Sequence, residues 1–187
     1  TGLDMLELTE PTYCRVEGLH LFGANQTRHG LSVLSGSEIA IRDVFAQQNS
    51  SFGFNFVDNF KVLLECCRAK SNLLGFVFNG PHTSVAAKNC YALNNINAGF
   101  YINDMTYSHF DTCASDANRE GYQVTVAQGL KFTACGAESC QRAGWHFENS
   151  AAANAASANC SHMETSDAFL MFSPTSTGIS TTTVLSS

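Results

Sequence analysis

The stretch from Gly53 to Gly75, GFNFVDNFKVLLECCRAKSNLLG, contains one complete unit of an internal repeat and the first residue of the next unit. Gly53 is followed by two apolar residues, Phe54 and Phe56, with one residue between them. The same arrangement follows the glycines at positions 30, 75, 99, 121 and 144, so the units are 22 to 24 residues long. A fixed period in the twenties is the signature of a solenoid protein.

Four further columns of residues recur with this period. One column is mostly cysteine: Leu21, Val44, Cys67, Cys90, Cys113, Cys135 and Cys160. Two residues later lies a column of mostly small residues: Gly23, Ala46, Ala69, Ala92, Ser115, Ala137 and His162. A polar column lies three residues beyond that: Gln26, Asn49, Asn72, Asn95, Asn118 and Cys140. Upstream of the cysteines stand spaced pairs: Ile39/Ile41, Val62/Leu64, Val85/Ala87, Ser108/Phe110 and Leu130/Phe132.

The spacing within each unit selects the kind of solenoid. Apolar residues alternate with a period of two, which is typical of strands and not of helices. The chain is therefore predicted to be all-β, a parallel β-helix with about three short strands per coil and neighbouring coils about 4.8 Å apart. The asparagines are predicted to hydrogen-bond between coils, and the glycines to provide either a positive φ or a close backbone approach.

The repeat also predicts the domain organisation. Residues 1–15 are a lead-in segment, residues 16–172 form about seven coils with a period of about 23, and residues 173–187 form a Ser/Thr-rich tail. Because the chain begins at Thr1 without a start methionine, we expect it to be a fragment of a longer protein.

Composition argues against several classes of partner. The net charge is −6 with only ten basic residues, which argues against binding a nucleic-acid backbone. No apolar run is long enough to cross a membrane. Five of the eight cysteines fall in one inward column, and there is no Cys-x-x-Cys or zinc-like spacing. We therefore expect free buried thiols, folding in a reducing cytoplasm, and no metal site.

Two outward faces carry further predictions. Before the cysteine column, Arg42, Glu65, Lys88 and Asp111 alternate in charge and are expected to pair along the helix axis. Another face carries exposed apolar residues, which a lone monomer rarely tolerates. We expect contact with other copies of the chain, in a homotrimer, through Phe22, Phe45, Tyr91 and Leu93.

The pattern Cys67-Arg68-Ala69-Lys70-Ser71-Asn72, leading to Gly75-Phe76, resembles the pectate-lyase-like right-handed β-helix superfamily. More narrowly, residues 16–172 are similar to phage tailspikes and capsule depolymerases. The resemblance implies a right-handed single-stranded parallel β-helix that assembles as a homotrimer. It also implies binding and hydrolysis of a bacterial surface polysaccharide, a capsule or O-antigen, without a cofactor. The implied location is the virion tail after folding in the host cytoplasm, or alternatively secretion.

Placement on outward strands suggests a catalytic pair, Asp104 and Glu148, two coils apart. Glycoside hydrolysis with inversion needs two carboxyl groups about 6.5–9.5 Å apart, so this spacing favours inversion. Tyr101, Gln123 and His146 share the same outward face and are predicted to bind the sugar. The alternative for Asp104 and Glu148 is that they are ordinary turn acids.

Two other functions stay open from the sequence. One is a non-catalytic glycan-binding or structural module of a tail fibre or adhesin. The other is a polysaccharide lyase, which needs a base beside a neutralised uronate. His109 or Tyr101 would serve as that base, with Lys131 one coil beyond His109 on the same face.

Overall fold

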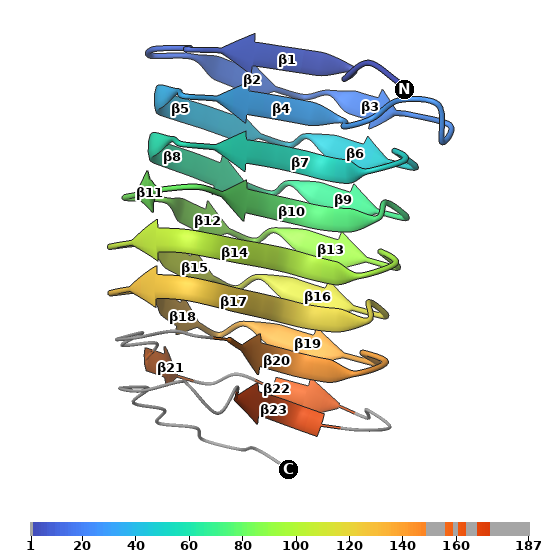
Figure 1. Ribbon diagram of the computed structural model, residues 1–187, viewed down its shortest axis with the longest axis vertical. Coiled ribbons are helices and arrows are strands. Elements are labelled where there is room, and N and C mark those ends of the chain that lie inside the picture. Colours follow the sequence, from blue (N-terminus) through green and yellow to red (C-terminus); the bar gives the residue numbers. More distant parts are fainter. Residues whose placement is uncertain (1, 149–155, 159–160, 164–167, 173–187) are drawn as a thin grey trace.

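The computed structural model describes residues 2–148, 156–158, 161–163 and 168–172, and every regular element among them is a β-strand. All paired strands run parallel, and the chain winds through three faces in each coil (Figure 1). The all-β parallel β-helix with a period of about 23 residues is therefore confirmed. In the part of the chain that the structure describes, no helix is present that could span a membrane.

The first face is the longest. It contains β1 (Leu6–Thr9), β4 (Leu31–Leu34), β7 (Phe52–Val57), β10 (Leu74–Asn79), β14 (Ala98–Thr106), β17 (Glu120–Gln128), β20 (Ala143–Phe147) and β23 (Ala168–Phe172). β1 falls within residues 1–15, the expected lead-in, and pairs in register with β4. The expected tail, residues 173–187, lies outside the described residues.

The second and third faces complete each coil. The second face contains β2 (Arg15–Glu17), β5 (Ser37–Arg42), β8 (Phe60–Glu65), β11 (His82–Thr83), β12 (Ala86–Lys88), β15 (His109–Asp111), β18 (Lys131–Thr133) and β21 (Ala156–Ala158). The third is a seven-stranded sheet of β3 (His20–Phe22), β6 (Phe45–Gln47), β9 (Arg68–Lys70), β13 (Tyr91–Leu93), β16 (Ala114–Asp116), β19 (Gly136–Glu138) and β22 (Ser161–Met163).

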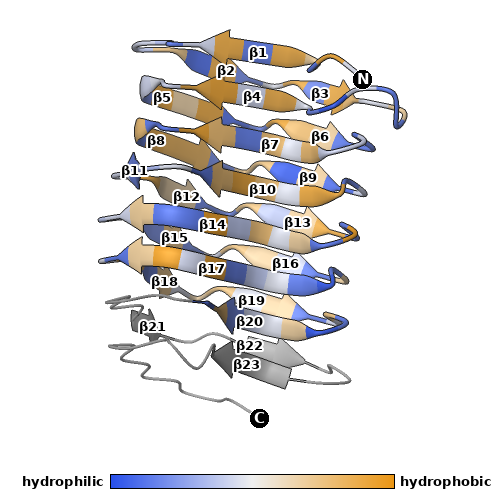
Figure 2. Cartoon of the chain, viewed as in Figure 1, coloured by the Kyte–Doolittle hydropathy of each residue, from blue (hydrophilic) through white to orange (hydrophobic). Residues whose placement is uncertain are grey.

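The core consists of like residues stacked between coils. Behind the first face runs a ladder of parallel rings with centroids 4.0–4.8 Å apart: Phe54, Phe76, Phe100, Tyr122 and Trp145. These rings are buried, whereas hydrophilic residues gather in the turns (Figure 2). Ring stacking between coils adds to the area that each ring buries. The repeated apolar columns therefore provide the main stabilisation of the helix.

The repeat glycines are needed because the backbone of the next coil lies close to them, and not because they have a positive φ. A Cβ on Gly53 would lie 2.9 Å from the Gly75 carbonyl oxygen and 3.0 Å from the Ala69 Cβ. Positive φ values occur instead at the corners of each coil, mostly in residues that are not glycine. One such corner column is Gly18, Asp43, Cys66, Asn89, Thr112 and Ala134.

The first coil corrects the predicted register. Leu21 pairs with Ala46 and so belongs to the small-residue column and not to the cysteine column. This coil is two residues longer than the next, because the turn after β3 contains extra residues and both Ala24 and Asn25 have positive φ. As a result Thr27, and not Gln26, contacts Asn49.

The same shift affects the third face. Phe22 lies beside Gln47, while Phe45 lies beside His20 and Arg68. The predicted outward charge ladder forms only in part, since Arg42 pairs with Glu65 at 2.6 Å and Lys88 has no ion pair among the described residues. The homotrimer through this third face stays a prediction, which one chain does not test.

Cys67, Cys90, Cys113 and Cys135 are buried as predicted, and no disulfide joins two of the described cysteines. Cys160 lies outside the described residues. Cys140 ends the polar column, where its Sγ lies 3.6 Å from the Ser115 carbonyl oxygen. The cysteine column thus behaves as a set of small apolar residues.

The asparagine ladder is confirmed from Asn49 to Asn118. The Oδ1 atom of Asn95 accepts from the backbone N–H of Asn72 at 3.0 Å and from its side-chain amide at 3.1 Å. The Nδ2 of Asn95 donates to the Ala69 carbonyl and to Asn118. Asn72, Asn95 and Asn118 therefore each satisfy one backbone N–H and one backbone carbonyl of the preceding coil.

Replacing Asn95 with alanine is expected to lower the free energy of unfolding by about 1–3 kcal/mol, because the Asn72 N–H and the Ala69 carbonyl lose their partner in the core. Urea unfolding measures this change. Asn103→Ala is the matched control, since it removes only an exposed hydrogen bond to Asn79. Equal unfolding midpoints for both variants would contradict the structural role of the ladder.

A second, shorter ladder contains the buried His82. The backbone N–H of Asn59 donates to His82 Nδ1 at 3.2 Å, just as the Gly36 N–H donates to Asn59 Oδ1 at 2.8 Å. Burial lowers the pKa of His82, and the N–H that Asn59 donates to Nδ1 also favours the neutral ring, while the charges of Asp58 and Asp104 act in the opposite direction.

The protein is expected to lose stability as the pH falls below about 6.5, the ordinary histidine value, because the unfolded chain then binds the proton more tightly than folded His82 does. The contribution of neutral His82 to the free energy of unfolding is complete above about pH 6.5. It is lost as the pH falls through the pKa that His82 has in the folded protein. His82→Asn keeps an acceptor for Asn59 and should make the loss smaller. Urea midpoints at several pH values measure it, and parallel profiles for both proteins would refute it.

Candidate functional site

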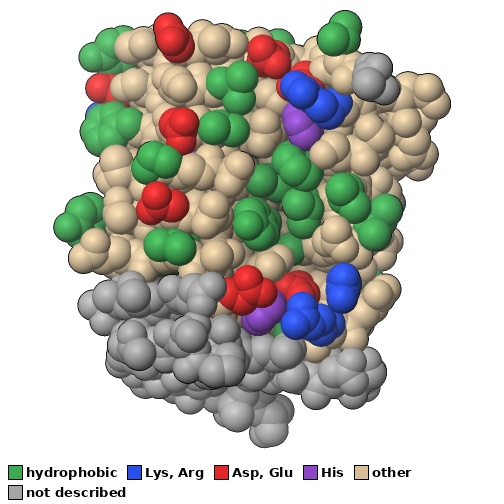
Figure 3. Space-filling view, viewed as in Figure 1, with side chains coloured by type: hydrophobic (Ala, Val, Ile, Leu, Met, Phe, Trp, Pro, Cys, Tyr) green, Lys and Arg blue, Asp and Glu red, His purple; other side chains and the backbone are tan. Residues whose placement is uncertain are grey.

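The candidate site lies on the outward side of the first face, over β14, β17 and β20. Tyr101, Gln123 and His146 are in register on these strands, one coil apart from each other. The structure thus brings together the three residues predicted to bind a sugar. Acidic, basic and histidine side chains gather at this end of the face (Figure 3).

A buried carboxylate anchors this cluster. Glu120 begins β17, and its side chain is 6 % exposed. One of its oxygens accepts a hydrogen bond from Arg142, and the other lies 2.9 Å from His146 Nδ1. A buried carboxylate needs such partners to remain charged. Glu120 therefore fixes both the guanidinium of Arg142 and the ring of His146.

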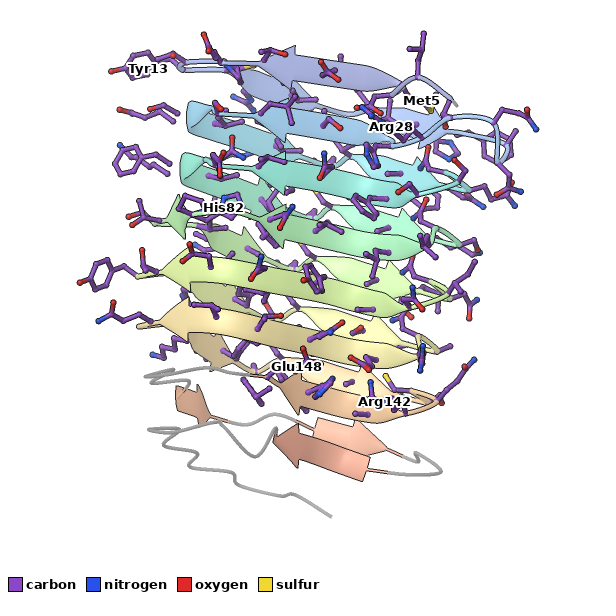
Figure 4. All side chains as sticks on the ribbon, viewed as in Figure 1. Met5, Tyr13, Arg28, His82, Arg142 and Glu148 are labelled. Atoms are coloured by element: carbon purple, nitrogen blue, oxygen red, sulfur yellow. The ribbon has the colours of Figure 1, made fainter. Side chains whose placement is uncertain are left out.

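Glu148 extends the cluster to the surface. Its Oε1 lies 3.3 Å from His146 Nε2 and 3.5 Å from Gln123 Nε2, and its side chain is 34 % exposed. Arg142 precedes β20 and Glu148 follows it, so they stand at opposite ends of this strand (Figure 4). The two ring nitrogens of His146 thus each face a carboxylate oxygen, Nδ1 that of Glu120 and Nε2 that of Glu148.

Beside this cluster is a pocket of about 300 Å³. It is lined by Leu74, Asn97, Ala98, Tyr101, Arg119, Glu120, Gln123 and Arg142. The backbone N–H of Arg142 donates to the Arg119 carbonyl at 2.8 Å, so the two arginines are stacked one coil apart. Arg119 is exposed and makes no ion pair with any described residue. The pocket thus offers one free and one anchored guanidinium.

Asp104 lies away from this cluster. It has a φ of 61° in a corner column with Ser35, Asp58 and Gly80, where the register of β14 and β17 is irregular. Its charge acts on His82, and no contact with Glu148 occurs among the described residues. The pairing of Asp104 with Glu148 for hydrolysis stays a prediction.

The second face holds the residues considered for a lyase base. His109 lies beside Lys131, as predicted, and its Nε2 is 3.0 Å from Thr133 Oγ1. Tyr101 lies on the first face and lines the pocket there. In the residues that the structure describes, no group of three or more His, Cys, Asp or Glu is arranged to hold a metal ion.

Sequence reasoning missed Arg119, Glu120 and Arg142. The two arginines occupy the same repeat position, two residues before Gly121 and Gly144, in consecutive coils. That repetition in the sequence could have predicted a basic surface. The burial of Glu120 had no such signal, because the equivalent residue of the next coil is alanine.

Comparisons with known proteins agree with this architecture. The family model described as a right-handed β-helix region matches residues 29–183. No curated protein sequence matches the chain. The crystal structure of pectate lyase Pel9A superposes with a TM-score of 0.66 and 14 % sequence identity, over 92 % of this chain and 54 % of the lyase. The chain therefore spans about half the length of that enzyme.

Proposed function

The chain belongs to the right-handed β-helix family, and from this premise we propose that it binds an acidic polysaccharide and cleaves it by β-elimination. The observation that carries the proposal is the pocket with two stacked arginines, Arg119 and Arg142, beside Tyr101 and Gln123. Arginine forms strong, often bidentate hydrogen bonds with carboxylates. The pocket is therefore suited to the carboxylate of a uronic acid.

The charges support this substrate class. The chain has a net charge of −6, yet this pocket gathers two of its ten basic residues. A neutral sugar gains little from a free guanidinium, whereas a uronate gains an ionic contact with Arg119. Tyr101 and Gln123 supply an aromatic surface and a hydrogen-bonding amide for the sugar ring. The site is thus polar and aromatic together, as carbohydrate recognition requires.

The proposed reaction uses Glu148 as the base. Glu148 takes the proton from C5 of the uronate, the C4–O4 bond breaks, and a C4=C5 double bond forms in the product. The leaving O4 takes a proton from the Tyr101 hydroxyl or from water. Arg119 and Arg142 stabilise the negative charge that builds on the uronate carboxylate. His146, held by Glu120, positions Glu148.

The superposition with a pectate lyase supports the proposal through the fold alone. By its name that enzyme acts on pectate, an acidic polysaccharide, but 14 % identity carries only the fold to this chain. The resemblance to phage tailspikes and capsule depolymerases makes bacterial surface polysaccharides that contain uronic acids the first polymers to test. A tail-borne homotrimer is the assembly that this resemblance implies.

Incubation with polymers tests the proposal. Polygalacturonate and uronate-containing capsules are the substrates, and uncharged dextran is the control. We expect new reducing ends together with the ultraviolet absorbance of unsaturated products, from the acidic polymers only. Reducing ends without that absorbance would mean hydrolysis and would favour the pair Asp104 and Glu148. Binding without cleavage would mean a glycan-binding module.

A further inference from the structure

A second basic surface lies on the third face, away from the pocket of the first. Arg68 and Lys70 are both on β9, two residues apart, and Ala69 between them is buried. Side chains two apart on a strand point to the same side, so both cations face outward. Their neighbours on β6 and β13 are Phe45, Gln47, Tyr91 and Leu93, none of which is charged.

The two cations form no ion pair with a described residue. No described carboxylate lies within ion-pair distance of Arg68 or Lys70. Asp43 lines the adjoining hollow, and Asp116 is already engaged by the Tyr91 hydroxyl at 2.7 Å. Arg68 is exposed and Lys70 is half-buried, and such basic groups without an ion-pair partner attract anions.

An aromatic residue lies on each side of Arg68, Phe45 on β6 and Tyr91 on β13. Phe45 is stacked on His20, with centroids 4.7 Å apart and planes 3° apart, and the hydrogen bond to Asp116 fixes Tyr91. Burial, followed by that hydrogen bond, raises the pKa of Tyr91 to about 12, so its ring stays neutral. Between these rings lies a hollow of about 240 Å³, lined by Phe45, Arg68, Ala69, Lys70, Tyr91 and Leu93.

We propose that this hollow is a second, non-catalytic binding site for an acidic sugar residue of a polysaccharide. The rings of Phe45 and Tyr91 pack against the sugar, and Arg68 and Lys70 bind its carboxylate or sulfate. The identity of the ligand rests on the proposed function, but the site itself does not depend on catalysis. A sugar in this hollow excludes the homotrimer contact expected through Phe45, Tyr91 and Leu93. Two sites on one chain hold a polymer more tightly than either site alone.

Retention on polymer columns tests this site. The full chain is compared with Arg68→Gln plus Lys70→Gln, on polygalacturonate, on dextran sulfate and on uncharged dextran. The double variant should bind about tenfold more weakly to an acidic polymer, since two ionic contacts at the surface are worth about that factor. Polygalacturonate and dextran sulfate separate a carboxylate from a sulfate ligand. The matched control, Lys61→Gln plus Lys88→Gln, removes the same charge from the second face.

The outcomes separate this site from the proposed function. Weaker retention of the Arg68/Lys70 variant alone supports the second site, and if the parent cleaves a short oligogalacturonate, the variant should cleave it at the same rate. It does so even if the chain cleaves no polymer, a result that would sink only the proposed function. Equal losses in both double variants, or no loss in either, would overturn the second site. A trimer that dissociates in the Arg68/Lys70 variant would assign this face to another copy of the chain.

Discussion

Replacing Glu148 with glutamine is expected to lower the rate of polysaccharide cleavage by about 10²–10⁴-fold, the usual contribution of a positioned general base. The amide keeps the size of the side chain and still meets His146 and Gln123, but it cannot accept the proton. Binding of an oligogalacturonate, measured by calorimetry, should stay close to that of the parent. Initial rates at saturating polymer measure the loss.

Asp104→Asn is the matched control, because it changes a carboxylate at a corner outside the cluster. Its rate should equal that of the parent. If both variants lose activity to the same degree, the two carboxylates act together, as the alternative hydrolysis requires. If Glu148→Gln keeps full activity, Glu148 is not the base.

Replacing Gly75 with alanine is expected to destabilise the fold by about 3 kcal/mol, the upper range for overpacking a core. The added Cβ would collide with the Gly99 carbonyl and lie 3.1 Å from Asn95 Nδ2 and 3.3 Å from the Ala92 Cβ. All three belong to the coil beneath and cannot move without breaking its hydrogen bonds. Urea unfolding followed by circular dichroism measures the change.

Gly18→Asn is the control for this change. Gly18 has a φ of 67°, but a Cβ there meets no atom within 4 Å. The same corner holds Asp43 and Asn89 in other coils, so a side chain is tolerated there. Its effect should stay below about 1 kcal/mol. If Gly18→Asn lowers the free energy of unfolding more than Gly75→Ala does, positive φ matters more than close packing, which would contradict this account of the glycines.

The sequence predicts this fold well because each column repeats under the same physical constraint. Phe54 and Phe76 stack because they occupy one position in successive coils, and Asn72 and Asn95 bond for the same reason. The register of the first coil was predicted wrongly, because two additional turn residues place Leu21 in the small-residue column, beside Ala46. An insertion in a turn changes which residues of two coils lie side by side, while the alternation of apolar residues in the strands stays the same.

Only the site residues that share a repeat position could be predicted from the sequence. Tyr101, Gln123 and His146 were found because they share one register position. Asp104 was paired with Glu148 by counting coils; the structure places it in the corner column of Ser35, Asp58 and Gly80, and the pairing stays a prediction. The role of Glu120 depends on side-chain burial and on its contacts with Arg142 and His146, which a repeat pattern does not encode.

The most direct measurement is a crystal structure of the Glu148→Gln variant soaked with an oligogalacturonate. The proposed function predicts a uronate in the pocket over β14, β17 and β20, with its carboxylate bound by Arg119 and Arg142. The C5 atom of that sugar should face residue 148. A well-ordered oligosaccharide over the second face, or one whose carboxylates all lie away from both arginines, would contradict it.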